Sequence, residues 1–151
     1  MNANVRNFFV CSVLLALDLI SKWLVVYYDP AMRFMFLGIR YTLNKGIALS
    51  LLDSFGVSQQ LALIFAISVV LLFYILHAAF KIYQNNDVQG ELLVIAGGLG
   101  NLVSRFWYGG VVDFIEIHFF GFQSSVFNIA DVLIAIGLTQ IVIRIFNDES
   151  A

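Results

Sequence analysis

Charged residues are scarce in this chain of 151 residues: Lys, Arg, Asp and Glu make up 12% of it, whereas 61% of its residues are hydrophobic. A soluble domain averages about 25% charged residues. The charges present are therefore too few to cover the surface of a water-soluble globule of this size. The 15 Phe, 6 Tyr and 2 Trp exclude a disordered chain. This composition predicts one integral membrane domain that covers residues 1–151.

Other rare residue types exclude further classes of function. Cys11 is the single cysteine, so no intrachain disulfide can form. His77 and His118 lie far apart in the sequence and belong to no metal-binding motif, so the sequence predicts no metal site. Eight basic and ten acidic residues give a net charge of −2 without any basic run. Nucleic-acid binding therefore has no electrostatic basis in this chain.

Four apolar stretches are long enough to cross the hydrocarbon core of a bilayer as helices, which takes about 20 residues each. We expect these spans at about residues 7–28, 61–83, 92–108 and 127–146. The segments 29–60 and 109–126 would then share one side of the membrane, with both termini on the other. The first apolar run continues past Asp18 and no cleavage motif follows it, which favours a retained span over a cleaved signal peptide.

Basic residues do not orient these spans. The side that holds the termini would carry Arg6, Lys81 and Arg144. The other side would carry Arg33, Arg40, Lys45 and Arg105. An excess of Lys and Arg normally marks the cytoplasmic side, and this distribution shows no such excess.

Two stretches outside the spans have the composition of β-strands. Residues 33–43, which follow Pro30, are rich in aromatic and β-branched side chains, and residues 114–119 are similar. The predicted fold class is therefore an all-α integral membrane protein with four transmembrane helices and a small strand-rich cradle outside the membrane. The exposed edges of such strands would suit an extended peptide as a partner.

Ionisable residues inside a membrane span are costly and are candidates for function. Asp18 and Lys22 are separated by one helical turn, so they share a face and can neutralise each other. For this pair taken alone, we favour a structural ion pair that docks the first helix against its neighbours.

Asp113 follows the third span and Asp131 lies in the first turn of the fourth, so both face the same side of the membrane. Each has an ordinary explanation: Asp131 would complete a capping box with Asn128, and Asp113 would be a surface carboxylate paired with Arg105. The functional alternative is a carboxylate pair. Two acids in a site of low dielectric constant have separated pKa values, so one can activate water while the other polarises and protonates a peptide bond.

Two further groups of residues lie near this pair in the expected topology. Asn101 and Arg105 share a helical face that points to the end of the third span, where they would bridge helices or support the carboxylates. Asn44 and Gly46 follow the first strand-like stretch and are ordinary turn residues.

The ordered set of these motifs resembles the signal peptidase II (lipoprotein signal peptidase) family. The matching residues, in chain order, are Asp18 and Lys22; Asn44, Gly46, Ala48 and Ser50 of an N-x-G-x-A-F-S box; Gly97, Gly98, Gly100, Asn101 and Arg105 of a glycine-rich G-N-x-x-D-R helix; residues 111–114 of V-V-D-F; and Phe127, Asn128, Ala130 and Asp131 of F-N-x-A-D-S. The departures are Leu49 for Phe, Ser104 for Asp, Val132 for Ser, and Gln-Ser-Ser-Val at 123–126 for a Trp-Pro segment. The motif order, span layout and length agree over nearly the whole chain.

This resemblance implies a monomeric aspartyl endopeptidase of the bacterial cytoplasmic membrane, with both termini in the cytoplasm and no cofactor. The substrate would be a diacylglyceryl-modified prolipoprotein, cut just before its lipidated cysteine, and membrane lipid would be the other partner. Asp113 and Asp131 would be the catalytic pair, and segment 29–60 would cradle the substrate. The residues that would bind substrate or brace the pair are Asn44, Gly46, Asn101, Arg105 and Asn128.

Two other functions stay open at this point. A small proton-coupled transporter or channel subunit would use Asp18, Lys22, Asp113 and Asp131 as a relay, and it would need ionisable groups throughout the bilayer depth. A catalytically silent family member would explain the departures at Ser104 and Val132.

Overall fold

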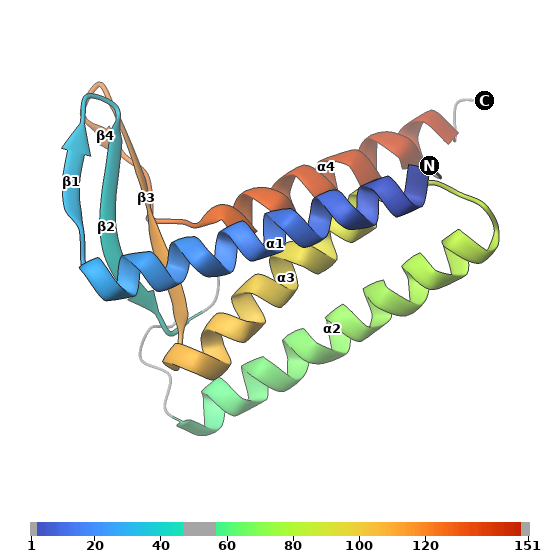
Figure 1. Cartoon of the computed structure of the whole chain (residues 1–151), viewed down its shortest axis with the longest axis horizontal. Coiled ribbons are helices and arrows are strands. Elements are labelled where there is room, and N and C mark those ends of the chain that lie inside the picture. Colours follow the sequence, from blue (N-terminus) through green and yellow to red (C-terminus); the bar gives the residue numbers. More distant parts are fainter. Residues whose placement is uncertain (1–2, 47–56, 149–151) are drawn as a thin grey trace.

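The computed structural model describes residues 3–46 and 57–148 (Figure 1). These residues form four helices and an antiparallel sheet. In chain order the elements are α1 (Ala3–Tyr28), β1 (Ala31–Phe34), β2 (Leu37–Asn44), α2 (Val57–Tyr83), α3 (Gln89–Tyr108), β3 (Val111–Phe119), β4 (Phe122–Gln123) and α4 (Ile129–Asp148). The sheet lies across one end of the helices, and the start of α1, the end of α4 and the α2–α3 turn lie at the other (Figure 1).

Within residues 3–46 and 57–148, three helices are long and apolar enough to cross a membrane: α1, α2 over Ser58–Tyr83, and α4 over Ile129–Asn147. The helix α3 is not among them, so length and hydropathy support three of the four predicted spans. The position of α3 explains its lower hydropathy, because α3 packs against each of the other three helices. A helix enclosed by protein does not need lipid-facing side chains on every side.

Glycines permit the close packing of α3. A Cβ atom on Gly97 would lie 2.4 Å from the carbonyl oxygen of Ala130 on α4, and one on Gly100 would lie 2.4 Å from Oδ2 of Asp18 on α1. Real Cβ atoms do not approach so closely, so a side chain at either position would force the helices apart. Small residues at helix contacts are typical of membrane proteins, where backbone proximity replaces hydrophobic burial as the source of attraction.

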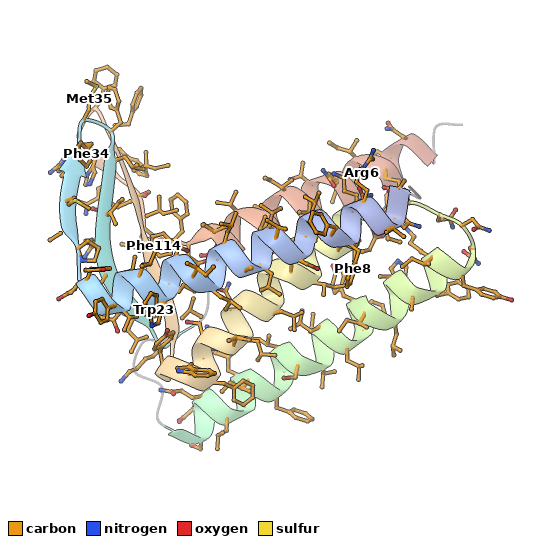
Figure 2. All side chains as sticks on the ribbon, in the orientation of Figure 1. Arg6, Phe8, Trp23, Phe34, Met35 and Phe114 are labelled. Carbon is orange, nitrogen blue, oxygen red and sulfur yellow. The ribbon has the colours of Figure 1, made fainter. Side chains whose placement is uncertain are left out.

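The outer surfaces of the helices are strongly apolar. Large side chains such as Phe8, Trp23, Phe65 and Phe73 are more than half exposed, and Figure 2 shows Phe8 and Trp23 on α1 pointing outward. Leaving so many large apolar groups exposed in water would be unfavourable, whereas in a bilayer their neighbours are lipid chains. The exposed surface of the bundle therefore has the character of a membrane protein.

The sheet has the strand order β1-β2-β3-β4 with antiparallel pairing throughout. Strands are present in both stretches for which the sequence predicts them. Thr42 pairs with Asp113 and Asn44 with Val111, and the register shifts between Ile39 and Thr42. This pairing brings the ends of two distant segments to the same corner of the sheet.

Two buried clusters hold the helices and sheet together. At the sheet end, Val25 on α1 packs against Val112 and Phe114 on β3. At the opposite end, the carboxylate of Glu91 on α3 is 1% exposed and accepts hydrogen bonds from Lys81 on α2, at 2.9 Å, and from Arg144 on α4. Glu91 carries no recognisable signature in the sequence, because its partners come from two other helices.

Candidate functional site

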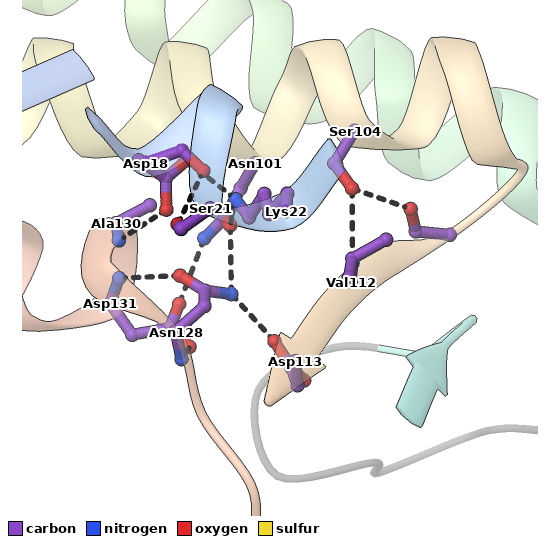
Figure 3. A network of polar contacts seen from close by, with 11 residues as sticks. Asp18, Ser21, Lys22, Asn101, Ser104, Val112, Asp113, Asn128, Ala130 and Asp131 are labelled. Atoms are coloured by element: carbon purple, nitrogen blue, oxygen red, sulfur yellow. Dashed lines mark hydrogen bonds and ion pairs between the residues drawn. The ribbon is translucent and has the colours of Figure 1, made fainter. Parts of the chain in front are cut away.

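A network of buried and half-buried polar side chains lies where α1, α3, β3 and α4 meet, at the end of the bundle next to the sheet (Figure 3). The start of α4 is held beside β3 by Phe127, whose backbone pairs with that of Ile115. The residue that follows Phe127 is therefore brought to the side of Asp113. The predicted residues Asp18, Lys22, Asn101, Asp113, Asn128 and Asp131 all belong to this network.

Asn128 connects the two aspartates. Its side-chain amide donates to Oδ1 of Asp113 at 2.5 Å. Its side-chain oxygen accepts from the backbone N–H of Asp131 at 3.0 Å, and the Asp131 carboxylate accepts in return from the backbone N–H of Asn128 at 3.2 Å. This is the predicted capping box at the start of α4. The cap and the link between the carboxylates are thus made by the same fully buried side chain.

Asn101 holds the second aspartate from α3. Its amide nitrogen donates to Oδ1 of Asp131 at 2.8 Å, and its oxygen accepts from Lys22 at 2.9 Å and from Asn128 at 3.2 Å. Because an ammonium group can only donate, Lys22 fixes which end of the Asn101 amide faces Asp131. The amide orientation that supports Asp131 therefore depends on a residue of α1.

The ion pair predicted from the spacing of Asp18 and Lys22 is present, with Nζ and Oδ2 2.8 Å apart and the two side chains 0% and 1% exposed. The other carboxylate oxygen of Asp18, Oδ1, accepts a hydrogen bond from the backbone N–H of Ala130 at 2.9 Å. The pair therefore docks α1 against α4 at the residue before Asp131. The ion pair also contacts the site, because Lys22 donates to Asn101, which in turn donates to Asp131. The interpretation of Asp18 and Lys22 as a purely structural pair did not include this contact.

Asp113 is 2% exposed, so its interpretation as a surface carboxylate is wrong. Its oxygens accept hydrogen bonds from Asn44, at 3.1 Å, and from Asn128. Burial, reinforced by the negative charge of Asp131, raises the pKa of Asp113 from its ordinary value of 3.8 to about 6. The two carboxylates are thus close enough for the charge of one to change the protonation of the other.

The predicted pairing of Asp113 with Arg105 is also wrong. The guanidinium of Arg105 donates to the backbone oxygens of Gly46, at 2.6 Å, and Lys45, at 3.4 Å. Gly46 in turn donates from its backbone N–H to the side-chain oxygen of Asn44 at 3.0 Å. Arg105 therefore holds the turn after β2, which keeps Asn44 in reach of Asp113. Ala48, Leu49 and Ser50 of the same motif lie outside the described residues.

Ser104 is a site residue that sequence reasoning noted only as a departure from a motif. Its hydroxyl donates to the carbonyl oxygen of Gly110 at 3.1 Å and accepts from the backbone N–H of Val112 at 3.0 Å, and the side chain is 1% exposed (Figure 3). It therefore ties the last turns of α3 to the start of β3. The one feature of the sequence that could have indicated this role is a small hydroxyl residue shortly before the Gly109-Gly110 turn.

The chemistry that this arrangement can perform is acid–base catalysis by two coupled carboxylates. Among the described residues, no group of three or more His, Cys, Asp or Glu side chains is placed to hold a metal ion. The carboxylates are instead surrounded by amide donors and by the cations of Lys22 and Arg105. These donors and cations stabilise ionised carboxylates, whereas burial and the neighbouring acid favour the protonated form of Asp113, and this balance suits a pair of acids that share one proton.

Comparisons with known proteins agree on the class of protein. The model of the family described as signal peptidase (SPase) II matches residues 10–147. A lipoprotein signal peptidase of Buchnera aphidicola subsp. Schizaphis graminum is 35% identical over 81% of each chain. That of Shigella flexneri is 32% identical over 99% of this chain and 94% of its own. A solved bacterial membrane enzyme shares the fold, with a TM-score of 0.77 and 23% identity over 96% of this chain and 90% of the other.

The fold is thus shared with a solved bacterial membrane enzyme, and the site contains two aspartates, Asp113 buried and Asp131 half-buried. The chain belongs to the signal peptidase II family and is a membrane peptidase. The resemblance inferred from the ordered motifs is confirmed.

Proposed function

We propose that this chain is an aspartic endopeptidase that removes the signal peptide from diacylglyceryl-modified prolipoproteins, cutting before the lipidated cysteine. The observation that carries this proposal is the double contact of Asn128, which holds Asp113 by its amide nitrogen and Asp131 by its capping hydrogen bonds. Two carboxylates braced in this way form a site for water-dependent peptide cleavage. The substrate class follows from the relatives named lipoprotein signal peptidases.

In this mechanism Asp113 carries the shared proton, because its pKa is raised to about 6. Ionised Asp131 takes a proton from a water molecule, and the oxygen of that water attacks the carbonyl carbon of the scissile peptide. Asp113 donates a hydrogen bond to the carbonyl oxygen, which stabilises the charge that develops there. The proton then passes to the nitrogen of the leaving peptide as the C–N bond breaks, which releases an amine and a carboxylic acid.

The neighbouring side chains have supporting roles in this proposal. Asn101 and Asn128 fix the two carboxylates, and Asn44 holds the second oxygen of Asp113. Arg105 and Gly46 set the position of the turn that follows β2. The exposed strands β1 and β4 at the edges of the sheet are suited to pairing with an extended substrate peptide.

We further propose that all four helices cross the membrane. The start of α1 and the end of α4 lie at the same end of the bundle (Figure 1), which requires an even number of crossings. A helix of 20 residues is about 30 Å long, so α3 has the length to span the hydrocarbon core. Both termini would lie in the cytoplasm, and the site would lie at the opposite surface. A lipid-modified substrate would reach it laterally from the bilayer.

A proton-coupled transporter fits the geometry less well. The ionisable residues at the sheet end are separated from the Glu91 cluster at the other end by an apolar layer of Cys11, Leu93, Ala96 and Leu133. A relay across the bilayer would need titratable groups through this layer. Ser104, where the family motif has an acid, braces β3, so this departure from the motif leaves the strand that carries Asp113 in place.

The test is a cleavage assay with purified protein and a diacylglyceryl-modified prolipoprotein. We expect Asp113→Asn and Asp131→Asn each to abolish cleavage while the variants remain folded and inserted. Asp29→Asn is the matched control, because Asp29 is an exposed acid at the sheet end of α1 and should keep wild-type activity. Full activity in either site variant would refute the aspartate mechanism. Equal cleavage of the unlipidated precursor would refute the substrate class.

A further inference from the structure

Both β-hairpins carry an apolar side chain where the backbone disfavours it. Met35, in the β1–β2 turn, has a φ of 34°, and Phe120, in the β3–β4 turn, has a φ of 43°. Gly, Asn and Asp are the usual residues at positive φ in hairpin turns, and other residues are strained there. The two residues are also 83% and 92% exposed. Neither the turn geometry nor burial within the chain explains an apolar side chain at these positions.

Other apolar side chains surround these two residues. The ring of Phe36, in the β1–β2 turn, has its centre 6.0 Å from that of Phe119 in β3, and Phe119 also makes an edge contact with Phe120. The backbone N–H of His118 donates to the carbonyl oxygen of Phe36 at 2.9 Å, which joins the two hairpins near their tips. We define the hairpin-tip patch as six residues, each more than half exposed: Phe34, Met35, Phe36, Phe119, Phe120 and Phe122.

The patch lies to the side of the helix bundle. The strands run across the end of the helices, so the hairpin tips project beyond the bundle (Figure 1), and Figure 2 shows Phe34 and Met35 at the far end of the sheet. The end of α1, which lies at the other end of β1 from the tips (Figure 1), carries exposed Trp23, Tyr27 and Tyr28. Trp and Tyr at helix ends are typical of the membrane–water interface. The projecting tips therefore overhang the bilayer surface beside the helices.

A basic residue accompanies the patch. Arg33 lines a hollow of about 200 Å³ together with side chains of both hairpin tips. Arg33 takes part in none of the ion pairs found among the described residues. An arginine with aromatic neighbours suits the depth of lipid headgroups, where the guanidinium meets phosphate and the rings meet the first methylenes.

We propose that the hairpin-tip patch inserts into the headgroup–acyl boundary of the bilayer and holds the sheet at the membrane surface. The bilayer is the expected occupant because the projecting patch lies at the same end of the bundle as the aromatic end of α1, where the apolar surface of the helices meets the membrane–water interface. Insertion removes Met35 and Phe120 from water, which accounts for apolar residues in strained turns. This inference does not depend on the cleavage reaction.

The first test measures the depth of Phe120. A nitrobenzoxadiazole label is attached at Phe120→Cys in a Cys11→Ala background, with one full-length chain per nanodisc of phosphatidylethanolamine and phosphatidylglycerol. We expect a blue-shifted emission that is quenched by lipids with a nitroxide high on the acyl chain. The same label at Asp29→Cys is the control and should emit as in water. Water-like emission from position 120, quenched by aqueous iodide, would overturn the proposal.

The second test separates insertion from folding. Asn favours positive φ, so Met35→Asn with Phe120→Asn keeps the turns while it removes the apolar side chains. We expect an unchanged or higher midpoint of thermal unfolding in detergent. A label at Phe36→Cys should lose most of its quenching by lipid in this variant and keep it in the control Ser125→Asn. Quenching that persists in the double variant would show that the tips do not drive insertion.

Discussion

Asn128, the residue before α4, donates a 2.5 Å hydrogen bond to Asp113 on β3, although the two are separated by 15 positions in the sequence. The same asparagine caps α4 through Asp131. Helix capping and the placement of the two acids are therefore one interaction, and a substitution of Asn128 should affect both stability and cleavage.

We expect Asn128→Ala to lower kcat about 10² to 10³-fold, the loss typical of removing one positioned hydrogen-bond donor from an active site. It should also cost about 1 kcal/mol of stability through the lost helix cap. Asn128→Ser separates the two effects, because serine caps α4 but has no amide to hold Asp113. Cleavage kinetics and thermal unfolding in detergent measure the two. Recovery of full activity by the serine variant would contradict this role.

The raised pKa of Asp113 predicts how cleavage depends on pH. If protonated Asp113 is the acid of the pair, kcat/KM should fall as the pH rises through about 6, since kcat/KM reports groups of the free enzyme. The measurement is a pH profile of kcat/KM with lipidated substrate. An Asp29→Asn control should give the same inflection. A profile that is flat between pH 5 and 7, a range of about one unit on either side of the expected inflection, would contradict the assignment of the proton.

The same shift predicts how stability depends on pH. The folded chain binds the Asp113 proton more tightly than the unfolded chain, so the stabilisation is present at low pH and is lost as the pH rises through the folded-state value of about 6. Two pKa units correspond to about 3 kcal/mol. Thermal unfolding midpoints should therefore decline between the ordinary value of 3.8 and the folded-state value of about 6, and level off at higher pH. Asp113→Asn should decline less, because it has no proton to lose.

Lys22→Met leaves Asp18 as a buried carboxylate without its cation. Removing one member of a buried ion pair costs about 3–5 kcal/mol, so we expect a marked fall in the unfolding midpoint. The pair Asp18→Leu with Lys22→Met should recover much of this stability, since no lone charge remains. Neither variant can orient Asn101, so cleavage should stay low in both. Wild-type kcat in the stable double variant would show that the ion pair acts on stability alone.

Ser104→Ala removes the hydroxyl that ties α3 to β3 and leaves Gly110 and Val112 each with an unpaired backbone group. We expect a loss of about 1–3 kcal/mol in stability and a lower kcat, with KM little changed, because Asp113 follows Val112 directly. Ser104→Thr keeps the hydroxyl and should restore activity. Ser68→Ala, which removes a hydrogen bond within α2, is the matched control. Normal kcat in Ser104→Ala would exclude the bracing role.

Local patterns predicted much of this molecule because they depend on residues near one another in the chain. The apolar runs indicated the helices, and the spacing of Asp18 and Lys22 indicated their ion pair. The pair Asn128 and Asp131 indicated the cap of α4 for the same reason. The pairing of Arg105 with Asp113, one of the two explanations weighed for that acid, was wrong, because the contacts of Arg105 are backbone oxygens that carry no signature in the side-chain sequence.

The sequence by itself determined that the chain belongs in a membrane, since 12% charged residues cannot cover a globule in water, and it placed two acids on one side. Tertiary structure decided which groups meet. Asp18 reaches Ala130 across 112 positions, and Asn44 reaches Asp113 across 69. Such contacts require polar groups on different helices and strands to come within hydrogen-bond distance of each other. The glycines of α3 and the strand register together permit that approach. The physical reason is that a hydrogen bond is decided by distances of a few tenths of an ångström, which are set by packing rather than by chain position.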